Sequence, residues 1–237
     1  MFDPQQIAVG VIWFVVFLFS ATAHEAAHAW MALRGGDKTA YHFGQVTLSP
    51  IPHMQREPFG MLIFPWITFF MNGWMMGWAS APYDPYWAMR YPRRAAWMSL
   101  AGPVANFILA AIAAILIRIG LGAGLFRPGM TMRFTDVIQA ADGTPAAMDA
   151  IATLLGIMFA LNILLGVFNL LPLPPLDGFT AIGLVLPEAM AAKLREWQMT
   201  MGAYQIFGML IAWQVAGYVI GPAYYLGLTL LFFGYQP

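Results

Sequence analysis

Four apolar segments, each long enough to cross a lipid bilayer as a helix, dominate this sequence. They lie at residues 6–33, 95–119, 149–171 and 203–220. The first has about 28 residues and as an α-helix extends roughly 42 Å, more than the roughly 30 Å of a bilayer's hydrocarbon core. The expected fold is therefore an all-α polytopic membrane protein, with residues 1–237 as a single integral membrane domain.

Two shorter apolar segments, at residues 59–79 and 222–234, contain helix breakers. Pro65 and an Asn-Gly pair interrupt the first, and Pro222 begins the second. Such breakers are tolerated at membrane depth where the chain folds back against protein. We therefore expect about four to six transmembrane or re-entrant helices in total.

The composition agrees with a membrane protein and limits the chemistry available. Hydrophobic residues make up 60% of the chain and charged residues only 9%, whereas a soluble domain carries about 25% charged residues. The formal net charge of zero provides no basic surface, so no nucleic acid partner is expected. Because the chain has no cysteine, a metal site must use His, Asp or Glu.

A small β-hairpin is predicted directly after the first apolar segment. Residues from Tyr41 to Leu48 alternate in character and include the strand formers Val46 and Thr47. Prolines follow immediately and end the pattern.

The first apolar segment also allows a second interpretation, as a cleaved secretory signal. The small residues at positions 20–23 resemble a cleavage site. However, residues 1–6 contain Asp3 and no Lys or Arg, and apolar character continues as far as Leu33. We therefore interpret the segment as a retained spanning helix.

The basic residues indicate an orientation in the membrane. If residues 59–79 do not cross, residues 34–94 and the segment near Lys193 lie on one side and carry eight of the eleven Lys and Arg residues. The positive-inside rule places that side in the cytoplasm. The C-terminal end of the first helix would then lie near the cytoplasmic side.

The first apolar segment carries a metal-binding pattern. His24 and His28 stand four residues apart, and Glu25 directly follows the first of them. On a helix, positions i and i+4 lie on one face, so both histidines can reach one metal ion. Glu25 lies about 100° around the helix, where it can hold a water molecule rather than the metal. This HExxH pattern predicts a site for one catalytic zinc ion.

A catalytic zinc ion needs about three protein ligands and one open position. Asp177 is the only acidic residue between Asp149 and Glu188, and it lies in a Pro-Pro-Leu-Asp-Gly break between apolar segments. Ionisable residues at membrane depth are usually functional. Proline removes helical donors and glycine allows close backbone approach at such a break. Asp177 is therefore the best candidate for the third ligand.

Together these residues resemble the site-2 protease family of intramembrane zinc metalloproteases. The family's motifs are matched by HEAAH at residues 24–28, AGPVAN at 101–106 and NLLPLPPLDG at 169–178. Further stretches at 36–40, 46–50 and 77–79 resemble the small bacterial and archaeal branch that lacks PDZ or CBS domains.

The resemblance implies a role for each matched residue. It makes His24, His28 and Asp177 the zinc ligands and Glu25 the catalytic base. Asn106 and Asn169 are similar to asparagines linked to the family's active-site region, where they hold substrate or the oxyanion.

The resemblance also implies an activity and a location. The activity is hydrolysis of peptide bonds within or near transmembrane segments, as in regulated intramembrane proteolysis, with a membrane protein or peptide as substrate. The location is the lipid bilayer of a prokaryotic cytoplasmic membrane.

The chain departs from the family's pattern at two places. The acidic residue that usually follows shortly after the Pro-His of the linker is replaced by MQRE at residues 54–57. The Lys-Pro that usually follows Gly-Trp-Ala is replaced by SAP at residues 80–82. Both departures lie outside the predicted ligand set, at positions where a substrate or gating segment acts.

Two other functions stay open at this point. A catalytically inactive homologue would keep the zinc ligands without proteolysis. A metal transporter would place several acids along a pathway, whereas the apolar segments and their breaks here offer only Glu25 and Asp177.

Overall fold

The computed structural model describes residues 3–235, and helices dominate this part of the chain. Among the described residues, four helical segments are long and apolar enough to cross a membrane. They contain α1 (Pro4–Gly35), α6 (Pro92–Gly122), α7 (Ala147–Asn169) and, continuing from α9 (Glu188–Met201) through the 3-10 turn η3 (Gly202–Tyr204), α10 (Gln205–Phe232). The predicted all-α polytopic fold is confirmed.

Two groups of short helices connect the long ones. The group between α1 and α6 consists of α2 (Thr39–His42), α3 (Ile51–Arg56), the π-helical turn η1 (Phe59–Ile63), α4 (Phe64–Asn72) and α5 (Pro85–Arg90). The group between α7 and α9 consists of α8 (Asp177–Ala181) and the 3-10 turn η2 (Ile182–Leu184).

The two interrupted apolar segments behave differently. The first is helical only over Phe59–Asn72, which as a helix extends roughly 21 Å and is too short to span a bilayer. It ends at Gly73, whose φ of 78° is left-handed, and residues 75–84 have no regular secondary structure. By contrast, α10 continues through Pro222 to Phe232. Residues 203–220 and 222–234 therefore belong largely to one helix.

A small antiparallel hairpin is present, but it lies in the connection between α6 and α7. Strand β1 (Phe126–Pro128) pairs with β2 (Ile138–Ala140), with Phe126 opposite Ala140. The strand predicted at residues 41–48 was wrong. Backbone hydrogen bonds there are local, from Phe43 to Thr39 and from Gln45 to Ala40, so the alternating side chains lie on turns and not on a pleated strand.

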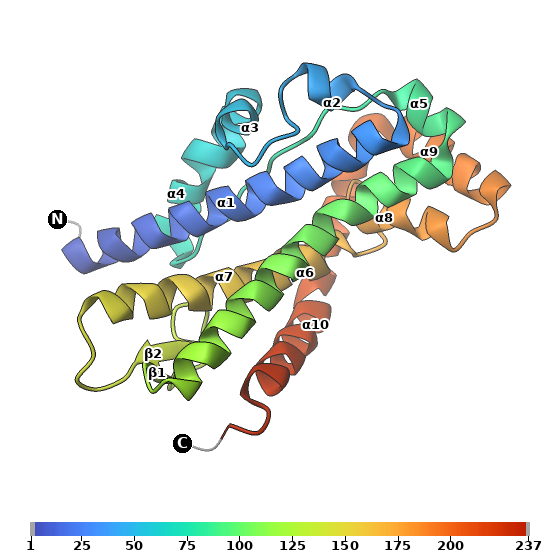
Figure 1. Cartoon of the computed structure of the whole chain (residues 1–237). Coiled ribbons are helices and arrows are strands. Elements are labelled where there is room, and N and C mark those ends of the chain that lie inside the picture. Colours follow the sequence, from blue (N-terminus) through green and yellow to red (C-terminus); the bar gives the residue numbers. More distant parts are fainter. Residues whose placement is uncertain (1–2, 236–237) are drawn as a thin grey trace.

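Helix α6 lies between α1, α7 and α10 (Figure 1). Its buried face is rich in small residues, among them Ala95, Ser99, Gly102, Ala110 and Ala113. Small residues let neighbouring helices approach closely, which is how helices associate where lipid removes the hydrophobic driving force. One apolar cluster joins α6 and α7 to the hairpin and α10, and another joins α1 to α4 and α7.

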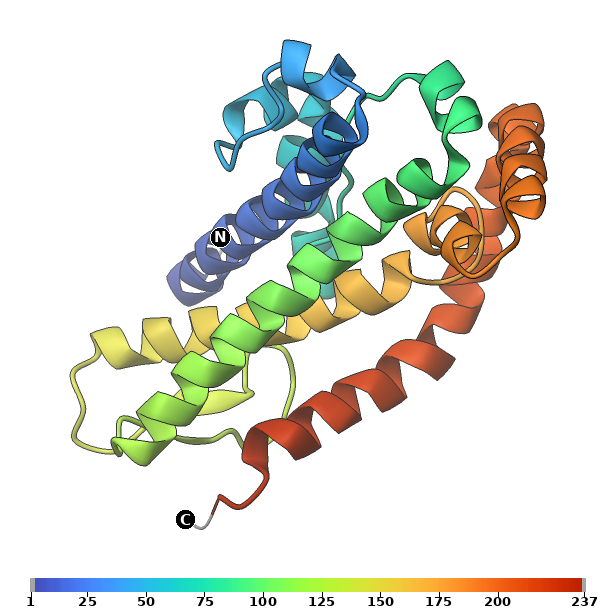
Figure 2. The same cartoon turned by 45° about the vertical axis from the view of Figure 1, so that its right-hand side comes forward.

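Helices α5, α8 and α9 lie at the end of the molecule where α1 ends and α6 begins (Figures 1 and 2). The carbonyl oxygen of Gly35 accepts hydrogen bonds from Trp87 Nε1 at 3.1 Å and from Arg94 Nη1 at 3.0 Å. These bonds occupy an otherwise free carbonyl at the end of α1. They also tie α1 to α5 and α6 beside the predicted metal ligands.

Candidate metal centre

The three predicted ligands converge on one point. His24 and His28 project from one face of α1, and their Nε2 atoms are 2.9 Å apart. Asp177, the first residue of α8, places Oδ2 3.1 Å from Nε2 of His24 and 3.3 Å from Nε2 of His28. Zinc bonds of about 2.0–2.1 Å at tetrahedral angles separate ligand atoms by about 3.3 Å. The donor types and their spacing therefore fit a zinc ion.

Glu25 lies beside the three proposed ligands. It is buried, and one of its carboxylate oxygens lies within 4.8 Å of ligand atoms of both His24 and His28. A carboxylate at this distance reaches a water molecule beside the metal position and is suited to accept a proton from it.

The position of Asp177 depends on close backbone packing. A side chain at Gly178 would clash with the backbone of Leu170 and Leu171, so only glycine allows α8 to begin so close to the end of α7. Leu176 before it has an extended backbone, with ψ of 155°. The chain therefore turns sharply at Asp177 and directs its carboxylate towards α1.

Gly102 of the AGPVAN motif keeps the space at the ligand atoms open. A Cβ atom built at this position of α6 would clash with the Nε2 atoms of both His24 and His28. The absence of a side chain therefore allows α6 to pack against the histidines without filling the position that a metal would occupy.

The tautomer of His28 is fixed by α6. Its Nδ1 lies 2.7 Å from the backbone carbonyl oxygen of Met98. Because a carbonyl only accepts, Nδ1 carries the hydrogen and donates it. Nε2 of His28 therefore keeps its lone pair for a metal.

The tautomer of His24 is fixed by a chain of buried amides. Asn162 Nδ2 donates to the carbonyl of Met158 at 2.8 Å and to Ser20 Oγ at 2.9 Å. The oxygen of Asn162 therefore faces Asn106, which donates to it from Nδ2 at 2.8 Å. This bond turns Asn106 Oδ1 towards His24, whose Nδ1 donates to it at 2.6 Å. The backbone carbonyl of Met158 on α7 thus sets the donor and acceptor direction of each hydrogen bond in the chain that ends at His24.

The two asparagines of the matched motifs differ in their surroundings. Asn106 is fully buried, with both ends of its amide bonded inside the protein. Asn169 donates from Nδ2 to the carbonyl of Leu165 at 3.0 Å, and its side chain lines the cavity beside the ligands. Of the two, Asn169 is the one that lines the cavity.

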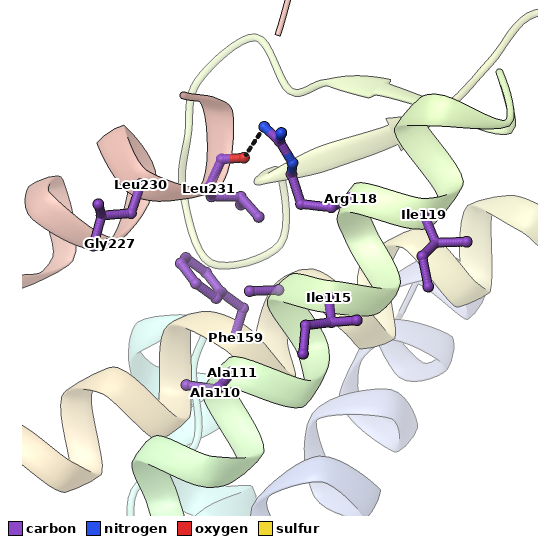
Figure 3. Close-up of a pocket in the computed structure, with 10 residues that line it drawn as sticks. Ala110, Ala111, Ile115, Arg118, Ile119, Phe159, Gly227, Leu230 and Leu231 are labelled. Carbon is purple, nitrogen blue, oxygen red and sulfur yellow. Dashed lines mark hydrogen bonds between the residues drawn. The ribbon is translucent and has the colours of Figure 1, made fainter. Parts of the chain in front are cut away.

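The ligands lie in a cavity of about 430 Å³ between α1, α6, α8 and α9. Its wall includes the extended segment 78–83, and its charged residues are Glu25, Asp177 and Arg195. An apolar cavity of about 480 Å³ lies between α6 and α10 (Figure 3). Among residues 3–235, no acid or histidine lines that second cavity, and its Arg118 donates to the carbonyl of Leu231 at the end of α10. The residues that can bind a metal therefore line the 430 Å³ cavity.

The two departures from the family's pattern contact each other. Arg56 Nε donates to Ser80 Oγ at 3.1 Å, and Ser80 Oγ donates to Glu57 Oε1 at 2.5 Å. These bonds tie the end of α3 to the extended segment that continues into the cavity wall. The two substitutions thus form one local contact.

Sequence reasoning missed three residues that shape this centre. Asn162 is the single polar residue between Thr153 and Asn169 of α7, and a polar residue at membrane depth is itself a signal. Gly102 lies in a motif that the sequence had already indicated, but only packing explains its role. Arg195 lies in a charged segment of the sequence that carries no motif.

Comparison with known proteins identifies the family of this chain. The family model described as Peptidase family M50 matches residues 12–213. The chain is 32% identical over 214 residues to "Putative zinc metalloprotease YwhC" of Bacillus subtilis, covering 88% of this chain and 83% of that protein. It is 30% identical over 176 residues to "Putative zinc metalloprotease Rip2" of Mycolicibacterium smegmatis, covering 73% of this chain and 58% of that protein. No solved structure is significantly similar. The chain therefore belongs to peptidase family M50, the site-2 proteases.

Proposed function

We propose that this membrane metalloprotease is an intramembrane endopeptidase that cleaves peptide bonds within or near transmembrane segments of other membrane proteins. His24, His28 and Asp177 hold one zinc ion, and Glu25 is the catalytic base. The observation that carries the proposal is the convergence of two Nε2 atoms and one carboxylate oxygen within 3.3 Å of one another. These atoms come from α1 and α8, and His24 and Asp177 are 153 positions apart in the sequence.

The chain's own residues divide the reaction between them. Zinc, when bound, supplies a Lewis acid that acidifies water and polarises the scissile carbonyl. Glu25 accepts a proton from the attacking water and delivers it to the leaving amine. Buried hydrogen bonds from His28 to Met98 and from His24 to Asn106 hold the two imidazoles with Nε2 facing the proposed metal position.

The proposed substrate must expose its backbone to the site. The carbonyls of a membrane helix are hydrogen-bonded within the helix, so the substrate has to unwind locally before Glu25 and the metal can act on it. Asn169 and the extended residues 78–83 line the cavity and offer polar groups to an unwound chain. Asn106 is proposed to orient His24 instead, because its amide has no free end.

We further propose that the site lies nearer the cytoplasmic side of a prokaryotic cytoplasmic membrane. His24 and His28 stand closer to the C-terminal end of α1 than to its start. Residues 34–94, from the end of α1 to the start of α6, carry six of the eleven Lys and Arg residues, and basic residues favour the cytoplasmic side.

The test is cleavage of a helical membrane substrate by the purified protein in detergent, with Glu25→Gln as the matched control. We expect the wild type to cleave, Glu25→Gln to retain zinc without cleaving, and a chelator to abolish cleavage. If zinc-loaded wild type cleaves no membrane-helix substrate from a broad panel, the inactive-homologue alternative is favoured. If Glu25→Gln cleaves as well as the wild type, the proposed base is wrong.

A further inference from the structure

A buried arginine shares the cavity with the metal ligands. Arg195 on α9 is only 3% exposed, and it lines the same cavity as His24, Glu25 and Asp177. It is buried together with Ala191 and Gln198. These residues stand four before it and three after it, so the helical repeat places all three on the inner face of α9. The inner face of this amphipathic helix thus presents a cation to the centre.

Only part of this guanidinium group is satisfied by the protein. Nη1 donates to Gln198 Oε1 at 2.8 Å and to Thr180 Oγ1 at 3.2 Å. The group lies over the ring of Tyr83, 5.2 Å from its centroid. Within residues 3–235, its Nε and Nη2 atoms have no hydrogen-bond partner, and no carboxylate pairs with it within 4.0 Å.

The two unpaired donors have a specific geometry. The Nε–H and Nη2–H bonds of arginine lie side by side on one edge of the planar group. That edge matches the two oxygens of a carboxylate and binds them in parallel. A buried charge without a partner is strongly unfavourable. Arg195 is held by Tyr83, Thr180 and Gln198 with this edge buried and unpaired, so it is suited to pair with an anion that enters the cavity.

The charge of the cavity agrees with such a ligand. Its charged residues are Glu25, Asp177 and Arg195, with a formal charge of −1 when both carboxylates are ionised. A bound divalent cation changes that charge to +1. The loaded cavity therefore favours an anionic group, and Arg195 is the place within it that carries free donors.

We propose that Arg195 is a substrate-binding residue that takes a carboxylate of the peptide substrate. This inference rests on the proposed function. The carboxylate comes either from an acidic side chain near the scissile bond or from a chain terminus, and both present the same two oxygens to the free edge.

The binding test uses the full-length, zinc-loaded Glu25→Gln protein in detergent. The probes are three apolar peptides of one sequence: one with a Glu side chain and an amidated C-terminus, one with Gln and an amidated C-terminus, and one with Gln and a free C-terminus. We expect a carboxylate-bearing peptide to bind about 10- to 100-fold more tightly than the peptide without one. Whichever probe shows the gain identifies the source of the carboxylate.

Two variants of the Glu25→Gln protein separate a binding role from a structural one. Arg195→Gln removes the charge. Gln198→Glu keeps the guanidinium and an acceptor for Nη1, but supplies a competing carboxylate from within the protein. Both are expected to reduce the carboxylate preference to less than threefold while zinc content stays unchanged. Gln198→Glu keeps the inference testable if Arg195→Gln does not fold.

The same substitutions in the active protein add a kinetic readout. We expect them to raise KM for carboxylate-bearing substrates and to change kcat little. Equal preference in the parent and both folded variants, or no preference in the parent, overturns the inference. Absence of cleavage by the wild type counts against the proposed function alone, because the binding arm with Glu25→Gln decides the role of Arg195 separately.

Discussion

Replacing Asn162 with leucine is expected to weaken zinc binding, although Asn162 bonds to none of the three proposed zinc ligands. The side chain accepts one hydrogen bond from Asn106 and donates to Met158 and Ser20. Leucine has a similar volume and removes these hydrogen bonds. Asn106 is then free to turn its amide, and His24 is no longer held with Nε2 unprotonated.

The size of this effect follows from the bonds involved. Substituting a group that orients a metal ligand typically reduces affinity about 10- to 100-fold, which corresponds to about 1.4–2.8 kcal/mol. Leaving the buried amide of Asn106 without a partner costs about 1–3 kcal/mol. We therefore expect the zinc Kd of Asn162→Leu to rise 10- to 100-fold.

The assay is competition for zinc with a chelator of known affinity, at fixed pH and in one detergent. Asn169→Leu is the matched control, because it removes an asparagine from the same helix that bonds only to the carbonyl of Leu165. Its zinc affinity should stay within threefold of the wild type. Nitrogen NMR of the metal-free protein with labelled histidine provides a second readout, in which Asn162→Leu should lose the single His24 tautomer. An unchanged Kd together with an unchanged tautomer would refute the reasoning.

Two further predictions concern other parts of the chain. Gly102→Ala should abolish zinc binding while the protein still folds, because its methyl group occupies the space at both histidine Nε2 atoms; elemental analysis that finds full zinc would contradict this. In the hairpin connection, burial raises the pKa of Asp136, but hydrogen bonds from Thr131 and Gln139 outweigh it and lower that pKa below its ordinary value of 3.8. The lowered pKa of Asp136 therefore stabilises the folded connection above pH 3.8, and this stabilisation is lost as the pH falls through the lowered pKa. Hydrogen-exchange protection of residues 129–139, corrected for intrinsic rates, should fall in acid, and Asp136→Asn should remove that dependence; identical acid profiles for the two proteins would contradict the assignment.

Much of the site could be predicted because its signals are local. The spacing of His24 and His28 places them on one face of any helix, and the apolar run around them requires a helix. Asp177 was found by elimination, since few acids lie near the apolar segments. Local sequence patterns are therefore enough to predict a ligand set made of histidines and acids within apolar segments.

The rest depends on packing between segments that are distant in sequence. The alternation at residues 41–48 suggested a strand, but a strand needs a partner, and there the backbone bonds to itself. Conversely, β1 and β2 pair across a connection whose residues gave little strand signal. The roles of Gly102 and Asn162 appear only when α6 and α7 are placed beside α1. The burial of Arg195 likewise appears only when α9 is placed against the cavity.

The most direct test of the central claim is the zinc content of purified wild type and Asp177→Ala, measured by elemental analysis in detergent. The account predicts about one zinc per chain in the wild type and a clear loss in the variant, because Asp177 supplies the third ligand atom beside the two histidine nitrogens. Zinc near zero in carefully prepared wild type would contradict the metal centre itself. Full zinc in Asp177→Ala would keep the histidine pair but exclude Asp177 as the third ligand.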